Sequence, residues 1–500
     1  MEQAWFPEQS AVSLLLRGVV TLYILHFLGR TFYGVFLSPL AKYPGPKLNA
    51  ATALPFWYNT LRGDQATWIQ RLHTQYGPVV RLSPARLSYI TAQAWKDIYG
   101  HRTTTTKDPK FYSPPINGVH SLVTEPSNDA HGRMRKIFSH AFSHKALVEQ
   151  EALIASYADL LVRKTRGDIV ATATTTTKKR FDLVKLFNFT TFDIMADLTF
   201  GEPLHQLETS AYAPWVTAIF GGFKASDMAR VTLEYPLLRR IWNMAMPPRL
   251  LAMRREHFQH AVDRVEARLA SPSGKADIWE LVLRDGGCMD AAQMHSNAAL
   301  FMLAGTETTA TLLSGLVFWL LRNPRAMQAL VGEIRGAFAA EEDMGLVNLQ
   351  RLRYMDACVQ EAFRMYPPVP IGGPRRVADG GAEICGAWVP GGTTVFVSQF
   401  AAYRSPLNFR DPESFVPERW MDGTGYETDS KEVLQPFSFG PRNCLGKNLA
   451  YHEIRLILAR TLWAFDIELC DESKDWAKQK SWTLWDKPPL MVRLTPVNKK

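Results

Sequence analysis

A cysteine near the C-terminus has neighbours suited to metal-ligand chemistry. Cys444 lies in the run Phe-Ser-Phe-Gly-Pro-Arg-Asn-Cys-Leu-Gly, which spans residues 437–446. Glycines in such a run permit positive φ and close approach of another group to the backbone. Arg442 precedes the cysteine by two residues, and an apolar pattern of helical period begins after Gly446. Because a helix N-terminus and a nearby arginine favour thiolate over thiol, we expect Cys444 to serve as a thiolate ligand.

The spacing within this loop is specific. Five positions have fixed separations, namely Phe437, Gly440, Arg442, Cys444 and Gly446. A thiolate presented on such a loop is the proximal ligand with which a haem iron favours O–O cleavage. The pattern resembles the haem-binding loop of the cytochrome P450 monooxygenases. This resemblance implies that the five residues bind haem b and that Cys444 is the axial ligand of its iron. From the residues alone, the alternative is a buried structural cysteine in a turn.

A long apolar segment carries a second candidate motif. A helix is expected over residues 290–321, with Asp290 as its N-cap. In its middle, Glu307 is followed by Thr308, and neighbouring threonines and a glycine predict a local weakening of the helix. The segment resembles the oxygen-activation motif of the P450 family, which implies that Glu307 and Thr308 are catalytic and relay protons. The structural alternative is that the threonines bond their own backbone.

Basic residues at two further places suit the propionates of a haem. His131 and Arg135 lie one turn apart on a helix that Asp129 is expected to cap. The family carries a histidine or tryptophan four residues before an arginine here, so the resemblance implies that both pair with propionates. One arginine of the pair Arg375 and Arg376 is expected to do the same, and the family's pattern favours Arg376. The alternative for His131 and Arg135 is a solvated polar helix face.

A pair of opposite charges is expected on another helix, over residues 354–366. Glu361 and Arg364 are three residues apart and therefore share a face. In the family such a pair is buried and joined by an arginine from a later loop, and Arg419 matches that position. Since a buried triad is tolerated only when every charge is paired, the resemblance implies a structural role in holding the cysteine loop. The alternative is an exposed pair of small consequence.

The N-terminal region has the character of a membrane anchor. Residues 11–28 are apolar apart from Arg17, and spanning a bilayer takes roughly 20 such residues. The Tyr-Pro-Gly-Pro-Lys run that follows is a stiff linker. We therefore expect an anchor at 1–42, a proline-rich hinge at 43–47 and a catalytic domain at 48–500. Basic residues follow the apolar run, so the positive-inside bias places the main body on the cytoplasmic side.

The overall composition describes a folded globular chain. Hydrophobic residues make up 46% and charged residues 21%. Five cysteines without paired spacing argue against a disulfide framework and a zinc site, and they fit a reducing compartment. The net charge of +9 comes without a dense basic helix, so nucleic acid is excluded as a partner, whereas a lipid surface or an acidic protein is compatible.

Periodicity predicts a mainly α fold with a small β region, which the motif order identifies with the P450 fold. Residues 100–126 lack any period and are too long for an idle connection. The resemblance implies that residues 111–120, together with 369–373, line a substrate pocket, which 220–235 and 481–485 also approach. Outside the motifs, helices are expected at 65–76 and over most of 145–270, and short strands at 79–82, 87–90, 383–386 and 395–398.

The resemblance implies a membrane-bound monooxygenase of fungal secondary metabolism, which inserts one oxygen atom from O₂ into a small apolar terpenoid, polyketide or related metabolite. Electrons would come from NADPH through a separate cytochrome reductase flavoprotein, because no flavin- or nicotinamide-binding segment follows Leu494. We expect a monomer at the endoplasmic reticulum membrane. The alternatives are an isomerase or dehydratase of the same fold, a non-catalytic haem-binding sensor, and a membrane interaction protein with vestigial motifs. The Glu307-Thr308 pair argues against the first of these.

Overall fold

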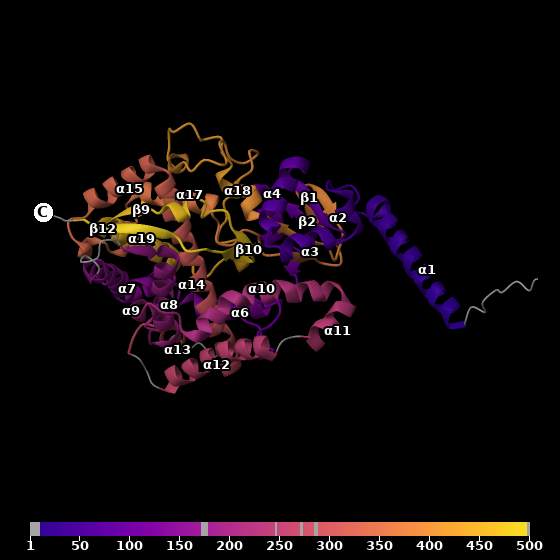
Figure 1. The fold of residues 1–500 in the computed structure, drawn as a ribbon, viewed down its shortest axis with the longest axis horizontal. Helices are drawn as coiled ribbons and strands as arrows, with labels where there is room; N and C mark the ends of the chain where they lie inside the picture. The colour runs from indigo at the N-terminus through magenta and orange to yellow at the C-terminus, as the bar shows by residue number, and fades with distance from the viewer. Residues whose placement is uncertain (1–10, 172–178, 246–247, 271–273, 285–288, 498–500) are drawn as a thin grey trace, which may run out of the picture.

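Helix α14 (Ala291–Arg322) lies inside the molecule (Figure 1). Most of its side chains are buried. Asp290 caps it as predicted, its carboxylate accepting a hydrogen bond from the Gln293 N–H at 2.7 Å. The helix is continuous, so the predicted local weakening around Glu307 is wrong. The computed structural model describes residues 11–171, 179–245, 248–270, 274–284 and 289–497.

Three helices that carry or support the motifs pack against α14: α8 (Leu183–Phe200), α17 (Arg353–Met365) and α19 (Lys447–Ala464). The two long helices α14 and α8 come very close at Gly305, where a Cβ would lie 2.6 Å from the Met195 sulfur. The predicted mainly α fold is confirmed.

The remaining α-helices of the described chain are α1 (Ala11–Phe32), α2 (Lys47–Ala51), α3 (Leu54–Leu61), α4 (Gln65–Tyr76), α5 (Ala92–Tyr99), α6 (Asn128–Ser139), α7 (His144–Ala171), α9 (Gln206–Thr209), α10 (Pro214–Glu234), α11 (Pro236–Ala245), α12 (Pro248–Ala270), α13 (Ile278–Arg284), α15 (Pro324–Ala337), α16 (Leu346–Leu349) and α18 (Gln399–Tyr403).

The β region consists of small sheets, and the largest brings distant segments together. Its strand order is β1-β2-β8-β5-β3, in which only β2 and β8 run parallel. A three-stranded sheet has the order β4-β12-β9, and β6-β7 and β10-β11 are separate hairpins. The strands are β1 (Val79–Ser83), β2 (Arg86–Tyr89), β3 (Thr105–Lys107), β4 (Arg180–Asp182), β5 (Arg375–Val377), β6 (Ala382–Ile384), β7 (Ala387–Val389), β8 (Thr394–Val397), β9 (Phe465–Leu469), β10 (Lys480–Trp482), β11 (Leu484–Asp486) and β12 (Met491–Pro496).

The structure corrects two local predictions. Strand β3 lies inside the segment that was expected to be wholly irregular, because its partner β5 is far away in sequence and leaves no local signal. Helix α6 is capped by Ser127, whose hydroxyl accepts from the Ala130 N–H at 3.3 Å. Asp129 therefore lies in the first turn of α6 and is not its cap.

The N-terminal helix α1 projects away from the body (Figure 1). The apolar segment Ser13–Leu37 is long enough to cross a membrane, and only 6% of its most apolar window is buried. At its end, Arg81 of β1 donates to the Gly34 carbonyl at 2.8 Å, and the Arg81 N–H donates to the Pro44 carbonyl at 2.7 Å. The junction between the apolar segment and the body is thus hydrogen-bonded to the sheet, and Lys47 already belongs to α2.

A buried network of charges joins α17 to the segment that leads to the cysteine loop. Glu361 accepts two hydrogen bonds from Arg364, at 2.7 and 2.9 Å, and forms an ion pair with Arg419 at 3.5 Å. The backbone N–H of Val416 also donates to Glu361, at 2.8 Å. Arg419 in turn pairs with Asp429. All four charged side chains are at most 1% exposed, and Asp429 extends the predicted triad to a neutral set of two carboxylates and two guanidiniums.

Asp429→Asn should destabilise the fold by roughly 3–5 kcal/mol, because it removes one of the two carboxylates that pair with the buried guanidinium of Arg419. Thermal unfolding of the purified protein measures the effect. Glu432→Gln is the matched control, since Glu432 lies three residues later but its pair with Lys96 is exposed and contributes at most about 1 kcal/mol. Equal melting temperatures for the two variants would show that the Asp429 contact adds nothing to the network.

Candidate active site

The cysteine loop is held in a single backbone path. The Cys444 N–H donates to the Phe437 carbonyl at 2.8 Å, which closes the loop. Gly440 has φ +74°, and a Cβ there would lie 1.9 Å from the Tyr99 carbonyl oxygen, so only glycine fits. Gly446 is the residue before α19, as the sequence predicts, although a Cβ at this position meets only ordinary contacts with Phe142. Cys444 therefore stands immediately before a helix N-terminus.

The electrostatics of the thiol differ from the sequence-based expectation. Protein atoms packed around the Cys444 sulfur raise its pKa, although the residue is exposed where they leave it open, and this effect is larger than the lowering by the Gly446 N–H, Arg135 and Lys447. The expectation that the helix and an arginine by themselves favour the thiolate is therefore wrong. A coordinated metal ion deprotonates a thiol directly, so a bound iron would supply the missing stabilisation.

Cys444 differs from the other described cysteines in its accessibility. Cys358 and Cys470 are buried, and Cys385 is half-buried with its sulfur 3.4 Å from the Thr91 hydroxyl. Cys444 is the one exposed thiol in the described part of the chain, while Cys288 lies outside the described residues. No group of three or more His, Cys, Asp or Glu residues that could hold a metal ion occurs among the described residues. A metal site at Cys444 would thus depend on a single protein ligand.

Cations gather around His131 on α6. Lys107, Arg135, Arg375 and Arg442 all act on this buried imidazole, and together with burial they lower its pKa to about 3. Burial and Arg375 lower the pKa of Arg442 to about 10, and burial, Arg375 and Arg442 lower that of Lys107. His131 is consequently neutral here and is not the cation that the sequence suggested. The cluster carries more positive charge than its protein surroundings offset.

The structure favours Arg375 over Arg376 for this cluster. Side chains alternate along β5, so Arg375 is buried and acts on His131, Lys107 and Arg442. Arg376 is exposed, and a Cβ at Gly392 would lie 3.4 Å from its guanidinium. The prediction of Arg376 is therefore corrected. The family's spacing could not distinguish neighbouring arginines, because which one faces inward depends on the register of β5 with β3 and β8.

Arg135, a predicted propionate ligand, and Arg442 of the predicted haem-binding loop both bind protein oxygens in this structure. Arg135 donates at 2.6 Å to both the carbonyl and the side-chain oxygen of Asn443, next to the cysteine. Arg442 donates to the carbonyls of Glu125 and Pro126 at 2.5 and 2.9 Å. These bonds fasten the cysteine loop to α6 and to the segment before it. Arg135 and Arg442 are thus part of the frame of the site.

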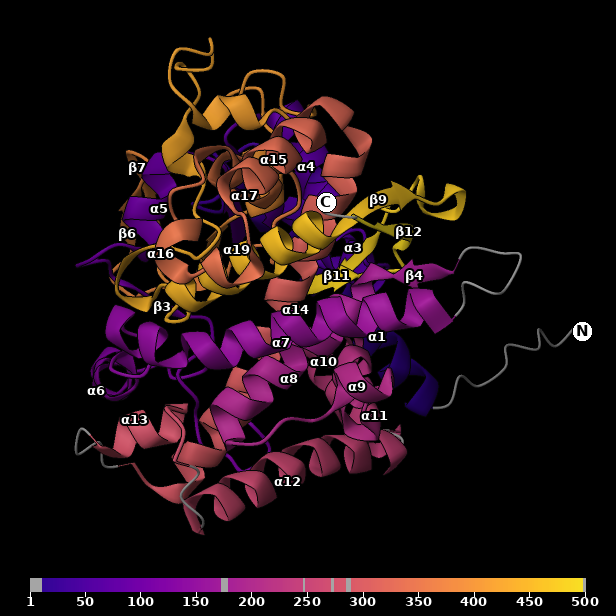
Figure 2. The same cartoon turned by 90° about the vertical axis from the view of Figure 1, so that its left-hand side faces the viewer.

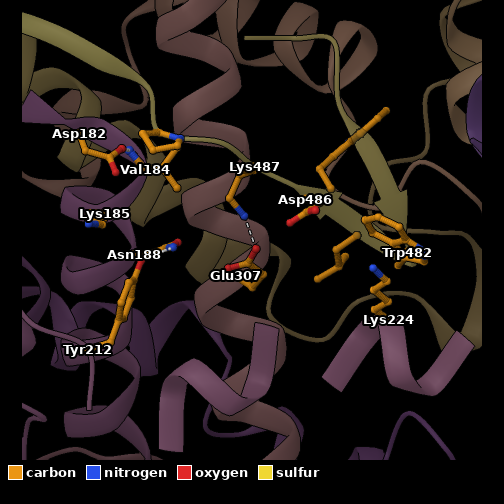
Figure 3. Close-up of a pocket in the computed structure, with 13 residues that line it drawn as sticks. Asp182, Val184, Lys185, Asn188, Tyr212, Lys224, Glu307, Trp482, Asp486 and Lys487 are labelled. Carbon is orange, nitrogen blue, oxygen red and sulfur yellow. Dashed lines mark hydrogen bonds and ion pairs between the residues drawn. The ribbon is translucent and has the colours of Figure 1, made fainter. Parts of the chain in front are cut away.

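The acid and the hydroxyl on α14 have separate partners. The Thr308 hydroxyl donates to the Ala304 carbonyl one turn earlier, at 2.6 Å, as the structural alternative predicted. Ala304 is exposed and Thr308 half-buried, whereas most of α14 is buried, so the two form an accessible stripe. Glu307 is buried and pairs with Lys487, which follows β11 (Figure 3). Glu307 and Thr308 are thus adjacent in the chain, but each side chain binds a different partner.

Sequence reasoning missed three residues that belong to this region: Lys107, Glu453 and Lys487. Lys107 lies on β3, and Lys487 lies in a connection without a motif, so only the tertiary contacts reveal them. Glu453 lies on α19, where burial raises its pKa to about 8 although Thr309 donates a hydrogen bond to it. Glu453 stands among other polar residues, between His452 and Arg455, so nothing in the sequence signals that it is buried.

The segments predicted to line a pocket do border cavities. A cavity of about 420 Å³ is lined by Trp482, Leu484 and Trp485 of the β10-β11 hairpin and also by Glu307 (Figure 3). A smaller one of about 60 Å³ is lined by Phe111 and by residues 371–372, as well as by α10. All four predicted segments therefore contribute lining residues to one cavity or the other.

The residues present fit a haem. An accessible thiol receives an N–H from Gly446, which suits an iron ligand. The cations around His131 suit two carboxylates, since charge-assisted hydrogen bonds to guanidinium and ammonium groups are the strongest that a propionate can make. Together with the fold, which Figure 2 shows to be made mostly of helices, these features define a haem-thiolate protein.

Comparison with known proteins agrees with that class. The family model described as Cytochrome P450 matches residues 44–494. The chain is 47% identical to the cytochrome P450 monooxygenase efuB of Hormonema carpetanum, over 95% of each chain. It is 45% identical to the monooxygenase FUM2 of Gibberella moniliformis, over 93% of this chain and 100% of that one, and 44% identical to AMT3 of Alternaria alternata, over 92% and 95%. The chain therefore belongs to the cytochrome P450 family and is a monooxygenase whose cofactor is haem b with a cysteine-ligated iron.

Stability should depend on pH through Glu453. Its pKa rises from 4.5 to about 8 on folding, so between these values the folded state binds more protons than the unfolded chain, and stability falls as the pH rises. Glu453→Gln keeps a hydrogen-bonding group for Thr309 but cannot ionise. Its melting temperature should therefore fall less between pH 5 and pH 8 than that of the wild type.

Glu468→Gln, which changes an exposed carboxylate, is the control and should follow the wild-type curve. Parallel curves for the wild type and Glu453→Gln would contradict an elevated pKa at this position.

Proposed function

We propose that this P450 monooxygenase oxidises a small apolar metabolite, of the terpenoid, polyketide or related class, at a membrane surface. It inserts one oxygen atom from O₂ and takes electrons from NADPH through a separate cytochrome reductase flavoprotein. The observation that carries the proposal is the exposed thiol of Cys444 in a glycine-bordered loop, on a chain whose relatives are named monooxygenases. The monooxygenase relatives favour this activity over a same-fold isomerase or dehydratase and over a haem-binding sensor.

Cys444 is proposed as the axial ligand, with Phe437, Gly440, Arg442 and Gly446 shaping its loop. A bound haem with a thiolate ligand supplies O₂ binding and O–O cleavage. The chain's own contribution is to fix the sulfur: the 2.8 Å bond from the Cys444 N–H to Phe437 and the bonds from Arg135 to Asn443 leave the loop little freedom. The role of Glu361, Arg364 and Arg419 follows from the same need, since their network holds the segment before this loop.

His131 and Arg375 are proposed to bind the propionates, together with Lys107. Two added negative charges would neutralise a cluster that the protein leaves positive, and they would raise the lowered pKa of His131. Glu307 and Thr308 are proposed as the catalytic pair. Oxygen activation consumes protons, and the Thr308 hydroxyl on the accessible stripe of α14 can pass one on, with Glu307 as the adjacent acid.

Features of the surface support the proposed location and partner. Helix α1 suits an anchor in the endoplasmic reticulum membrane, with the body of a monomeric enzyme on the cytoplasmic side. Three exposed basic residues, Arg133, Lys136 and Lys447, lie on α6 and α19, the two helices that adjoin the cysteine loop. A basic surface of this kind attracts an acidic protein, which is consistent with docking of the flavoprotein near the cofactor.

Cys444→Ser should abolish the thiolate-type carbon-monoxide difference spectrum and NADPH-dependent product formation. Cys385→Ser is the control, because Cys385 is the half-buried thiol among the described cysteines. This variant should leave both readouts intact. If Cys444→Ser keeps its pigment and an unchanged difference spectrum, the ligand assignment is wrong.

Arg375→Gln should release haem faster than the wild type, and Arg376→Gln should not. A charge-assisted hydrogen bond contributes about 1.5–3 kcal/mol, which corresponds to roughly 10- to 100-fold in the dissociation rate. Transfer of haem to an excess of apomyoglobin measures this rate. Faster loss from Arg376→Gln alone would restore the assignment made from the sequence.

A further inference from the structure

Arg86 on β2 is a buried cation whose hydrogen-bonding capacity is largely unused. It is 8% exposed, and its guanidinium carbon lies 4.0 Å from the ring centroid of Phe56 and 5.4 Å from that of Trp57. Its hydrogen bond to the Ser83 hydroxyl is long, at 3.4 Å. A guanidinium carries five N–H donors, so most of those on Arg86 have no acceptor among the described residues.

The two carboxylates that act on Arg86 have other partners. Glu234 approaches it only to 4.0 Å and lies 3.3 Å from the ammonium of Lys110. Asp108 accepts hydrogen bonds from the Thr394 hydroxyl at 2.6 Å and from the Lys110 N–H at 2.9 Å. Burial outweighs both carboxylates and lowers the pKa of Arg86. Because a buried charge with unused donors is costly to maintain, this position suits an added anion.

Arg86 lines the cavity of about 60 Å³, and a second unused donor lines it as well. The indole N–H of Trp57 is buried and has no acceptor among the described residues. One water molecule needs roughly 10–15 Å³, so the cavity has room for a larger group. Apolar side chains form another part of its wall, and these are Phe56, Phe111, Ile371, Pro374 and Phe396. The cavity therefore offers donors for a polar group and apolar contacts for whatever is attached to it.

Another buried arginine on this cavity shows a contrast. Arg230 lies over the ring of Phe111 at 3.8 Å, but it is in direct contact with the carboxylate of Asp227. It also donates to the Thr483 hydroxyl at 2.9 Å. Arg230 thus has an anionic partner within the protein, whereas the nearest approach of a carboxylate to Arg86 is 4.0 Å.

The cavity adjoins the frame of the cysteine loop. Gly372, which lines it, precedes Gly373, whose carbonyl accepts a hydrogen bond from the Tyr99 hydroxyl at 2.8 Å. The backbone carbonyl of Tyr99 is the group against which Gly440 of the loop packs. Tyr99 therefore joins the wall of the cavity to the loop that presents the proposed iron ligand. The cavity is close enough to the proposed site of oxidation to bind a distant end of the substrate.

We propose that Arg86 and Trp57 bind a carboxylate at one end of an otherwise apolar substrate, and so select the substrate and its orientation. The rings of Phe56 and Trp57 hold the plane of the guanidinium, and a carboxylate can accept two parallel hydrogen bonds from its edge. The Trp57 N–H adds a donor from α3. This inference rests on the proposed function and narrows its substrate class to organic acids.

Binding of matched probes to the holoenzyme tests the proposal. The probes are dodecanoic acid and farnesoic acid, each compared with its methyl ester by isothermal titration calorimetry at about pH 7.5, where the acids are ionised. Each acid should bind the wild type roughly 10- to 100-fold more tightly than its ester, because only the acid makes charge-assisted hydrogen bonds. Acids that bind no more tightly than their esters would overturn the proposal.

Arg86→Met should remove this preference without changing the affinity for the esters. Arg86→Lys should keep part of it, because an ammonium retains the charge but not the two parallel hydrogen bonds. Arg62→Met is the matched control and should keep the full preference. The guanidinium of Arg62 lies 5.5 Å from the ring of Tyr58 on α3, but it is 57% exposed and does not line the cavity. An Arg86→Met protein that still prefers the acids would overturn the carboxylate site.

Trp57→Phe removes the indole N–H and keeps an aromatic ring beside Arg86. It should weaken the binding of both acids by roughly 2- to 10-fold, and unchanged affinity would overturn the proposed pair of donors. This variant decides the matter if Arg86→Met lacks the carbon-monoxide difference spectrum and is therefore not folded around its cofactor.

Calorimetry requires no turnover, so loss of the acid preference overturns the carboxylate site and leaves the monooxygenase activity standing. Failure of the proposed function shows separately, as a Cys444→Ser protein with an unchanged carbon-monoxide difference spectrum.

Discussion

Compensation of buried charge is the constraint on which the rest of this structure depends. Glu361, Arg364, Arg419 and Asp429 are buried together, and their charges cancel. The network also accepts hydrogen bonds from backbone, so few of its polar atoms are left without a partner. Because such a set is destabilised when any member is lost, it fixes the relative positions of α17 and the long segment that precedes the cysteine loop. Phe363, on the same helix, packs against Phe437 with ring centroids 5.1 Å apart.

Charge compensation also separates the residues with a structural role from those with a proposed role in binding or catalysis. Around His131 the positive charges exceed the negative ones, and the pKa values of the imidazole, of Lys107 and of Arg442 are all lowered. Glu307 is compensated by one lysine but keeps an unsatisfied oxygen. Among the described residues no cation lowers the pKa of Glu453, and burial raises it to about 8, so its carboxyl stays protonated and uncharged at neutral pH. The residues proposed to bind the cofactor or to transfer protons are therefore those whose buried charge is not fully compensated.

Motifs with fixed local spacing were predicted well from the sequence, and contacts between distant segments were not. The Cys444 loop, the cap of α14 and the Glu361-Arg364 pair depend on residues a few positions apart, and the structure contains all three. The sequence favoured Arg376 within the pair Arg375 and Arg376, because inward or outward orientation in β5 depends on pairing with β3 and β8 and leaves no local signal. Asp429, Lys107 and Lys487 were missed for the same reason. The thiol pKa was misjudged because burial, which outweighs the local helix and arginine, is a property of the whole fold.

The junction after α1 has a consequence for how this enzyme meets its substrates. Arg81 reaches back from the sheet to Gly34, and a Cβ at Gly34 would lie 2.6 Å from the Ala50 carbonyl oxygen, so the chain is packed tightly where it leaves the apolar segment. With α1 in a bilayer, as proposed, a hydrogen-bonded and tightly packed junction would restrict the tilt of the body against the lipid surface. Molecules dissolved in the lipid would then encounter one constant face of the protein. The depth and orientation of a substrate in the lipid would then determine which end of it enters the protein first.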